Sequence, residues 1–238
     1  MNKWLPLAAL LGGLAAGSAQ AESLRILLIQ LPGVMEGVME GEGQDFHGGG
    51  VDLLRELSRR ADIPFSFEVY PQARSMLLVQ QTPDTCIPLS RFLGPRLQLK
   101  WSAPVLPIQL VLFSRGDDTL LVPDLEHARK LRIGAMRGSA VAARLHELGL
   151  ALEESSDYQT GLRKLQLGRL DLWGMVDIGV STLSTRVGIP HPRAALVVDK
   201  SDIALACNPQ VSDRAMSKLD HAIESMRQDG SMGRFDMK

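Results

Sequence analysis

The side chains that could carry out chemistry form no recognised catalytic arrangement in this sequence. Ser139 lies in Gly138-Ser139-Ala140 rather than in a G-x-S-x-G turn, and no motif indicates a histidine and an aspartate partner for it. There is no HExxH metal motif, and no nucleotide-binding glycine pattern follows a strand. The five histidines have no paired-metal spacing: His47, His127, His146, His191 and His221. We therefore predict no catalytic residue, no metal and no cofactor.

Gly138 and Ser139 are typical of a helix start that can bind an anion. Residues 131–136 are expected to form a strand, Arg137-Gly138 a tight turn, and Ser139 the cap of a helix that ends at Gly149. Unpaired backbone N–H groups at a helix start attract negative charge. Both residues are candidate anion ligands, although they serve equally well as a simple cap.

Cys86 and Cys207 are the two cysteines of the chain. In an oxidising compartment they could form a disulfide, which would close a long loop. They could equally remain two buried thiols, because sequence spacing does not give their separation in space. Both alternatives stay open from the sequence.

Strands and helices alternate in the elements that would position these residues. In the first half we expect strands at 24–30, 65–69 and 85–89, helices at 51–61 and 72–80, and a glycine-rich loop at 31–50. In the second half we expect strands at 131–136, 169–174 and 203–206, with helices at 139–149, 158–167 and 179–186 and a long amphipathic helix at 212–227. This order predicts an α/β fold of two lobes, each with a mostly parallel sheet, and a cleft between them.

The first 21 residues have the order of regions found in a secretory signal peptide. Lys3 precedes an apolar run at 5–16, and Ala19-Gln20-Ala21 is a cleavage site. The apolar run is too short for a permanent membrane anchor. A net charge of −1 with mixed signs gives no electrostatic footprint for nucleic acid or an anionic membrane. We expect a periplasmic protein.

Several short motifs occur in a fixed order along the chain. They are H-G-G-G-V-D-L-L at 47–54, S-R-F-L-G-P-R at 90–96, W-S-A-P at 101–104, I-G-A-M-R-G-S at 133–139, a leucine-rich stretch ending in G-R-L-D at 162–171, and D-G-S at 229–231. Together they resemble the periplasmic solute-binding proteins of polar amino-acid uptake systems, the type II or family 3 group. The resemblance covers nearly all of the chain after residue 21.

The resemblance implies a two-lobed type II periplasmic-binding fold that closes about a hinge. It implies crossing strands near 105–114 and 200–207, a first lobe of residues 22–107 plus 205–238, and a second lobe of residues 108–204. The implied ligand is an amino acid or a related zwitterion. The implied partner is the membrane permease of an ABC transporter, and we expect a monomer.

The resemblance also implies where charged groups meet the ligand. An arginine fork donates two parallel hydrogen bonds to a carboxylate. Arg96 best matches the arginine of the family and Arg91 is its rival, while both could be solvated loop residues. Ser90 would add a hydroxyl. Asp177 follows the 168–171 motif, where it either meets the ligand's ammonium group or caps a helix.

Three further side chains are candidates with a structural alternative. Trp101 and Trp173 would form apolar walls of the site, or else belong to the core. Arg74 either reaches the cleft or faces solvent. The first loop of the family carries an acid and aromatic residues, and here residues 31–36 contain Glu36 but no aromatic side chain.

Two other functions stay open beside transport. A sensing module that presents its ligand to a membrane receptor has the same sequence features. Some members of this fold are dehydratases or lytic enzymes, and a periplasmic lyase is the less favoured alternative.

Overall fold

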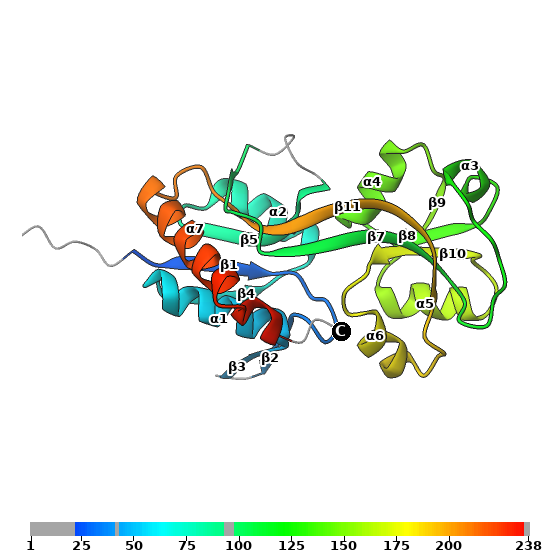
Figure 1. Cartoon of the computed structure of the whole chain (residues 1–238), viewed down its shortest axis with the longest axis horizontal. Helices are drawn as coiled ribbons and strands as arrows, with labels where there is room; N and C mark the ends of the chain where they lie inside the picture. Colours follow the sequence, from blue (N-terminus) through cyan, green and yellow to red (C-terminus); the bar gives the residue numbers. More distant parts are fainter. Residues whose placement is uncertain (1–21, 41–42, 93–97, 236–238) are drawn as a thin grey trace, which may run out of the picture.

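The chain folds into two lobes that lie side by side (Figure 1). The computed structural model describes residues 22–40, 43–92 and 98–235. Elements of the first lobe are β1 (Leu24–Leu28), β4 (Phe65–Val69), β5 (Thr85–Ser90), β6 (Lys100–Trp101), α1 (Gly49–Ala61), α2 (Gln72–Gln81) and α7 (Asp213–Gln228). Elements of the second lobe are β8 (Ile133–Met136), β9 (Leu152–Ser155), β10 (Leu172–Val176), α3 (Leu125–Ala128), α4 (Ala140–Glu147), α5 (Tyr158–Gln166) and α6 (Val180–Val187).

Two long antiparallel strands connect the lobes. They are β7 (Leu106–Ser114) and β11 (Arg193–Cys207), and both run from one lobe into the other in Figure 1. The strand order is β4-β1-β5-β11-β7-β10-β8-β9, with β1 parallel to β4 and β5, and β8 parallel to β9 and β10. Residues 203–207 of β11 pair with β5, and residues 193–203 pair with β7. The crossing strands expected near 105–114 and 200–207 are therefore present.

One hydrogen-bonded ladder runs through both lobes, but each lobe has its own hydrophobic cores. In the first lobe, β1 packs on α1 and α7 on one face, while Leu27, Ile87 and Val79 of α2 pack on the other. In the second lobe, one core lies under α4 and a second lies under α5 and α6. The division into two lobes therefore follows from separate packing and not from a break in the sheet.

The helix predictions agree with the structure, and two of them depended on an apolar stripe. Val51, Leu54, Leu57 and Ala61 of α1 are all buried, as predicted. The inward face predicted for 212–227 is buried in α7: Ala215, Leu219, Ala222, Ile223 and Met226. Ser139 caps α4, since its Oγ accepts a hydrogen bond from the N–H of Ala142 at 3.0 Å.

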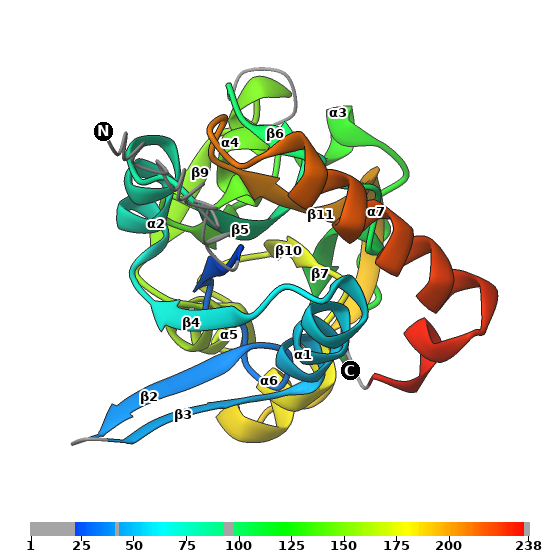
Figure 2. The same cartoon turned by 90° about the vertical axis from the view of Figure 1, so that its left-hand side faces the viewer.

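Three predictions of local structure need correction. The expected loop at 31–50 contains a hairpin, β2 (Glu36–Glu40) and β3 (Gly43–His47), which projects from the first lobe (Figure 2). The expected strand at 203–206 is the end of a 15-residue strand, β11. The expected strand at 169–174 begins later, at Leu172, because residues 169–171 first connect it to α5: the N–H groups of Arg169 and Leu170 donate to the carbonyl of Lys164, and that of Asp171 donates to the carbonyl of Arg132.

Cys86 and Cys207 form a disulfide, so the alternative of two free thiols is wrong. They face each other directly in the antiparallel pair of β5 and β11, with a Cα–Cα distance of 4.0 Å. The bond joins positions 121 residues apart, and it ties the returning strand β11 to the centre of the first lobe.

In the part of the chain that the structure describes, no helix is both long enough and apolar enough to cross a bilayer.

Candidate functional site

A polar cavity of about 440 Å³ lies against the two strands that connect the lobes. Residues from β7, from β11 and from the end of β10 line it: Pro107, Ile108, Gln109, Asp177, Lys200, Ser201 and Asp202. Charges of both signs therefore meet at the junction of the lobes. Among the described residues, no group of three or more histidine, cysteine or acidic side chains could hold a metal ion.

Asp177 is held at this junction by the backbone of Gln109. The last residue of β10, Val176, pairs with Leu110 of β7, and the next residue continues the ladder. The N–H of Gln109 donates to Asp177 Oδ1 at 2.8 Å, and the N–H of Asp177 donates to the carbonyl of Gln109 at 3.1 Å. The carboxylate is thus fixed at the edge of the cavity, and the residue is exposed.

Ser90, the last residue of β5, and Arg91 directly after it lie near the same connecting strands. Ser90 pairs with Ile203, the neighbour of the cavity residue Asp202. The Arg91 guanidinium donates to the carbonyl of Ser102 at 2.6 Å and lies 5.7 Å from the centre of the Trp101 ring. Its buried Nε atom has no partner among the described residues. Arg91 and Trp101 therefore contact each other, and Trp101 is half-buried beside Ala206 of β11.

Gly138 and Ser139 occupy the turn between β8 and α4, as predicted. Gly138 has a φ of 69°, and a side chain at this position would meet no atom within 4 Å. The turn is therefore open to solvent on this side. The Ser139 hydroxyl is already engaged as the helix cap, so a ligand would meet the backbone of this turn.

The remaining candidates are not gathered at the junction. The Arg74 guanidinium lies on α2 in the first lobe, 4.7 Å over the ring of Tyr70. Trp173 has no exposed surface and lies in the core under α5 and α6, where its ring packs against Gly161 and Gly134. Its placement is that of a core residue and not of a cleft wall. Arg96 and residues 1–21, the predicted signal peptide, lie outside the described residues.

The lobes also contact each other away from the connecting strands, between the first loop and α6. Arg186 of α6 donates from Nη1 to Glu36 Oε2 at 2.7 Å and from Nη2 to Glu36 Oε1 at 3.0 Å. The guanidinium of Arg186 lowers the pKa of the Glu36 carboxyl, and the Gly33 N–H, 2.6 Å from Oε1, adds to this effect. Sequence reasoning noted Glu36 but missed Arg186, because no local pattern relates residues 150 positions apart.

Apolar residues of the second lobe also reach the core of the first. Tyr158, Val176 and Ile178 pack against the cluster formed by β1, α1 and α7. Burial raises the pKa of the Tyr158 hydroxyl to about 12, so this side chain is neutral at physiological pH. The lobes are therefore in contact through packing as well as through charge.

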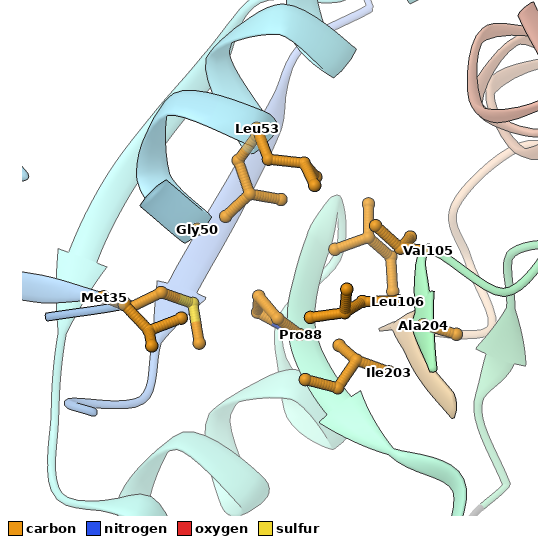
Figure 3. Close-up of a pocket in the computed structure, with 11 residues that line it drawn as sticks. Met35, Gly50, Leu53, Pro88, Val105, Leu106, Ile203 and Ala204 are labelled. Atoms are coloured by element: carbon orange, nitrogen blue, oxygen red, sulfur yellow. The ribbon is translucent and has the colours of Figure 1, made fainter. Parts of the chain in front are cut away.

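A small apolar cavity of about 30 Å³ lies behind the first loop. Figure 3 shows Met35, Leu53, Pro88 and Ile203 pointing into it from the loop, α1, β5 and β11. Because every lining side chain is apolar, this cavity offers no partner for a charged group.

Comparison with known proteins gives structural similarity only. No family model matches the sequence, and no curated protein matches it. The structure is similar to the amino acid ABC transporter substrate-binding protein AbpA from Streptococcus pneumoniae bound to L-arginine, at 13% identity and a TM-score of 0.71, covering 90% of this chain and 92% of that one.

Two further solved structures have the same arrangement. A histidine kinase sensor domain with similarity to periplasmic binding proteins has 15% identity and a TM-score of 0.69, with 89% of this chain and 93% of that one covered. An ancestral amino-acid-binding protein described as a precursor of cyclohexadienyl dehydratase has 12% identity and a TM-score of 0.69, with 90% and 92% covered. At these identities the likeness shows a shared fold.

Proposed function

We propose that this chain, which has the type II periplasmic-binding fold, captures a small polar ligand by lobe closure and delivers it to an ABC transporter. The observation that carries the proposal is the polar cavity at the junction of two separately packed lobes, with Asp177 fixed at its edge. A lobe that has its own core can move as a body when the connecting strands bend. Closure then brings groups from both lobes onto one ligand.

The proposed binding groups come from both lobes. Asp177 is the acid for a ligand ammonium group, and Ser90 lies beside the same strands. The backbone at Gly138 and Ser139 is the partner for an anionic group. The carboxylate fork is Arg91 or Arg96. The proposed lobes are residues 22–107 with 205–238, and residues 108–204.

The ligand class in this proposal is an amino acid or a related zwitterion. Support comes from the similar structures, of which one was solved with L-arginine and another is an ancestral amino-acid-binding protein. We propose export to the periplasm through residues 1–21, no catalytic activity, and a monomer that meets a membrane permease. Sensing is the second candidate, because a histidine kinase sensor domain shares the fold.

A ligand screen with one matched pair of variants tests the proposal. Amino acids, small organic acids and amines are tested by thermal shift, since a ligand that binds the folded state raises Tm. Asp177→Asn keeps an oxygen that can accept from Gln109 but removes the charge. We expect it to weaken binding of the best ligand by about 30-fold or more, as for truncation of a desolvated charge pair.

The control is Asp117→Asn, on an exposed turn of the second lobe away from the cavity residues. It should bind as the unmodified protein does in calorimetry. Equal affinity of the Asp177 variant and the control would remove Asp177 from the site. A screen in which no compound raises Tm would contradict the capture of a small polar ligand.

A further inference from the structure

The ion pair between Glu36 and Arg186 joins the two lobes without any ligand. Glu36 begins β2, directly after the first loop, and Arg186 lies in the last turn of α6. Two parallel N–H···O contacts of 2.7 and 3.0 Å connect the guanidinium to both carboxylate oxygens. Such bidentate pairs have a fixed geometry and are stronger than single contacts. The Glu36 side chain is 18% exposed, so solvent screens it less than a fully exposed acid.

The carboxylate of Glu36 is held in place before Arg186 reaches it. The N–H of Gly33 lies 2.6 Å from Glu36 Oε1, within the first loop itself. Gly33 has a φ of 78°, which suits glycine, and this conformation turns its N–H toward the acid. A group that is already oriented loses less conformational entropy when it forms a contact. The first loop therefore presents a preorganised acceptor to the second lobe.

Glycines on both sides allow the first loop and α6 to approach closely. A Cβ atom at Gly33 would lie 2.7 Å from the Thr182 side chain. A Cβ atom at Gly179 would lie 2.9 Å from the carbonyl oxygen of Pro32. Any larger residue at either position would push the lobes apart. The contact surface thus fits the arrangement of the two lobes in this structure, with the ion pair at one end of it.

Both oxygens of Glu36 accept hydrogen bonds from protein, so this acid is already used in joining the lobes. The guanidinium of Arg186 comes from the second lobe, and it connects the two lobes as a bound ligand would. Ile178 and Tyr158 add apolar contact with the core of the first lobe along the same side. Each of these contacts holds the lobes together in the arrangement of this structure, which we call closed, and none of them needs a ligand.

We propose that Glu36 and Arg186 form a latch that shifts the lobes toward closure in the ligand-free protein. The consequence for binding rests on the proposed capture function, since a ligand adds only its own differential affinity for the closed form. The latch would raise ligand affinity by increasing the fraction of molecules already closed. Because Arg186 already supplies the cation that pairs with Glu36, a ligand needs no cationic group to neutralise this acid.

The test measures the distance between lobes in ligand-free protein. Spin labels are placed at Leu77→Cys on α2 and Leu121→Cys in the second lobe, both exposed positions, with the native disulfide intact. Pulsed dipolar spectroscopy then compares the unmodified pair with Glu36→Gln, Arg186→Gln and both together. Because the ion pair is partly exposed, we expect its loss in each single variant to lower the closed-to-open ratio roughly two- to five-fold.

The double variant should be no more open than either single variant, because the two side chains act through one contact. Salt at about 1 M should open the unmodified protein and have little effect on the variants. Arg163→Gln, in the last turn of α5, is the control and should leave the distances unchanged. The salt measurement needs no substitution, so it still decides the question if a variant folds poorly.

Two results would overturn the latch. One is a set of distances that is the same in the unmodified protein and in all three variants and is insensitive to salt. The other is opening by Glu36→Gln but not by Arg186→Gln, which would give Glu36 a different partner. Neither result touches the capture function, because no ligand is present; a failed ligand screen in turn leaves the latch measurement valid.

Discussion

The two lobes are assembled from the chain in different ways. The first lobe combines an N-terminal segment with the end of β11, α7 and a short 3-10 helix (Ser231–Arg234), which return after the second lobe. The disulfide, the packing of α7 on the core with α1, and Arg60, which binds Glu56 and Asp229, hold the returning segment. The second lobe is one continuous segment, and its centre is filled by Trp173.

This difference shows two solutions to the cost of ordering a chain. Bringing together segments far apart in sequence has a larger entropic cost than closing short loops. The first lobe offsets it with a covalent bond and charge pairs between distant residues. The second lobe has short connections and depends on how well its core is packed.

The largest expected effect comes from the core of the second lobe. Trp173→Ala removes a fully buried ring that packs on Gly161 and Gly134, and we expect a loss of about 3–5 kcal/mol in unfolding free energy. Urea unfolding followed by circular dichroism measures it. Leu167→Ala, at an exposed position of the same lobe, is the control and should change stability little. A loss below about 1 kcal/mol would mean that packing does not hold this lobe.

Removal of the disulfide should have the next largest effect, and in the first lobe. The double change Cys86→Ser with Cys207→Ser opens a loop of 121 residues, and a loss of about 2–5 kcal/mol is expected. Thermal unfolding with and without reductant measures it. The reductant should destabilise the unmodified protein and leave the double variant unaffected. If the double variant had the same Tm as the unmodified protein, packing alone would hold the returning segment.

The smallest effect concerns the charges around Arg60. Hydrogen bonds from Arg59 and Arg60 lower the pKa of Glu56 from 4.5 to about 2. Because the folded pKa is depressed, the contribution of this acid is complete above about pH 4.5 and is lost as the pH falls toward 2. We expect at most about 1 kcal/mol from this partly exposed cluster.

Urea unfolding at several pH values checks this contribution. Glu56→Gln should be less stable than the unmodified protein at pH 6, and the gap should close near pH 2. Glu126→Gln is the control, because it removes an acid that pairs with Arg129 within the second lobe. A gap that is independent of pH would show that Glu56 acts by packing and not by charge.

The sequence predicted those parts of the fold that have a local pattern. The stripe of Val51, Leu54 and Leu57 determines α1, and the alternation at 65–69 determines β4. The hairpin at 36–47 was missed because its glycine-rich sequence has no such alternation. Residues 193–199 of β11 were missed, and the strand forms there through its ladder with β7.

Part of the candidate site was predicted as well, where a short local motif marked the residues. Motif order identified Ser90, Gly138 and Asp177 as candidates, and the structure places Ser90 and Asp177 beside the connecting strands. For Trp173 the sequence left two roles open, a wall of the site or a core residue, because its burial depends on the distant glycines that pack against its ring. The pairing of Glu36 with Arg186 depends on how two lobes approach, and no local spacing carries that information.

The disulfide has one more consequence, for the integrity of the molecule. Cys86 and Cys207 enclose both connecting strands and the entire second lobe within a single covalent ring. A protease that cuts an exposed stretch of this ring, such as the one around Leu121, would leave both fragments attached to each other. A nicked molecule would stay in one piece until the disulfide was reduced, so a single cut alone would not release half of the protein.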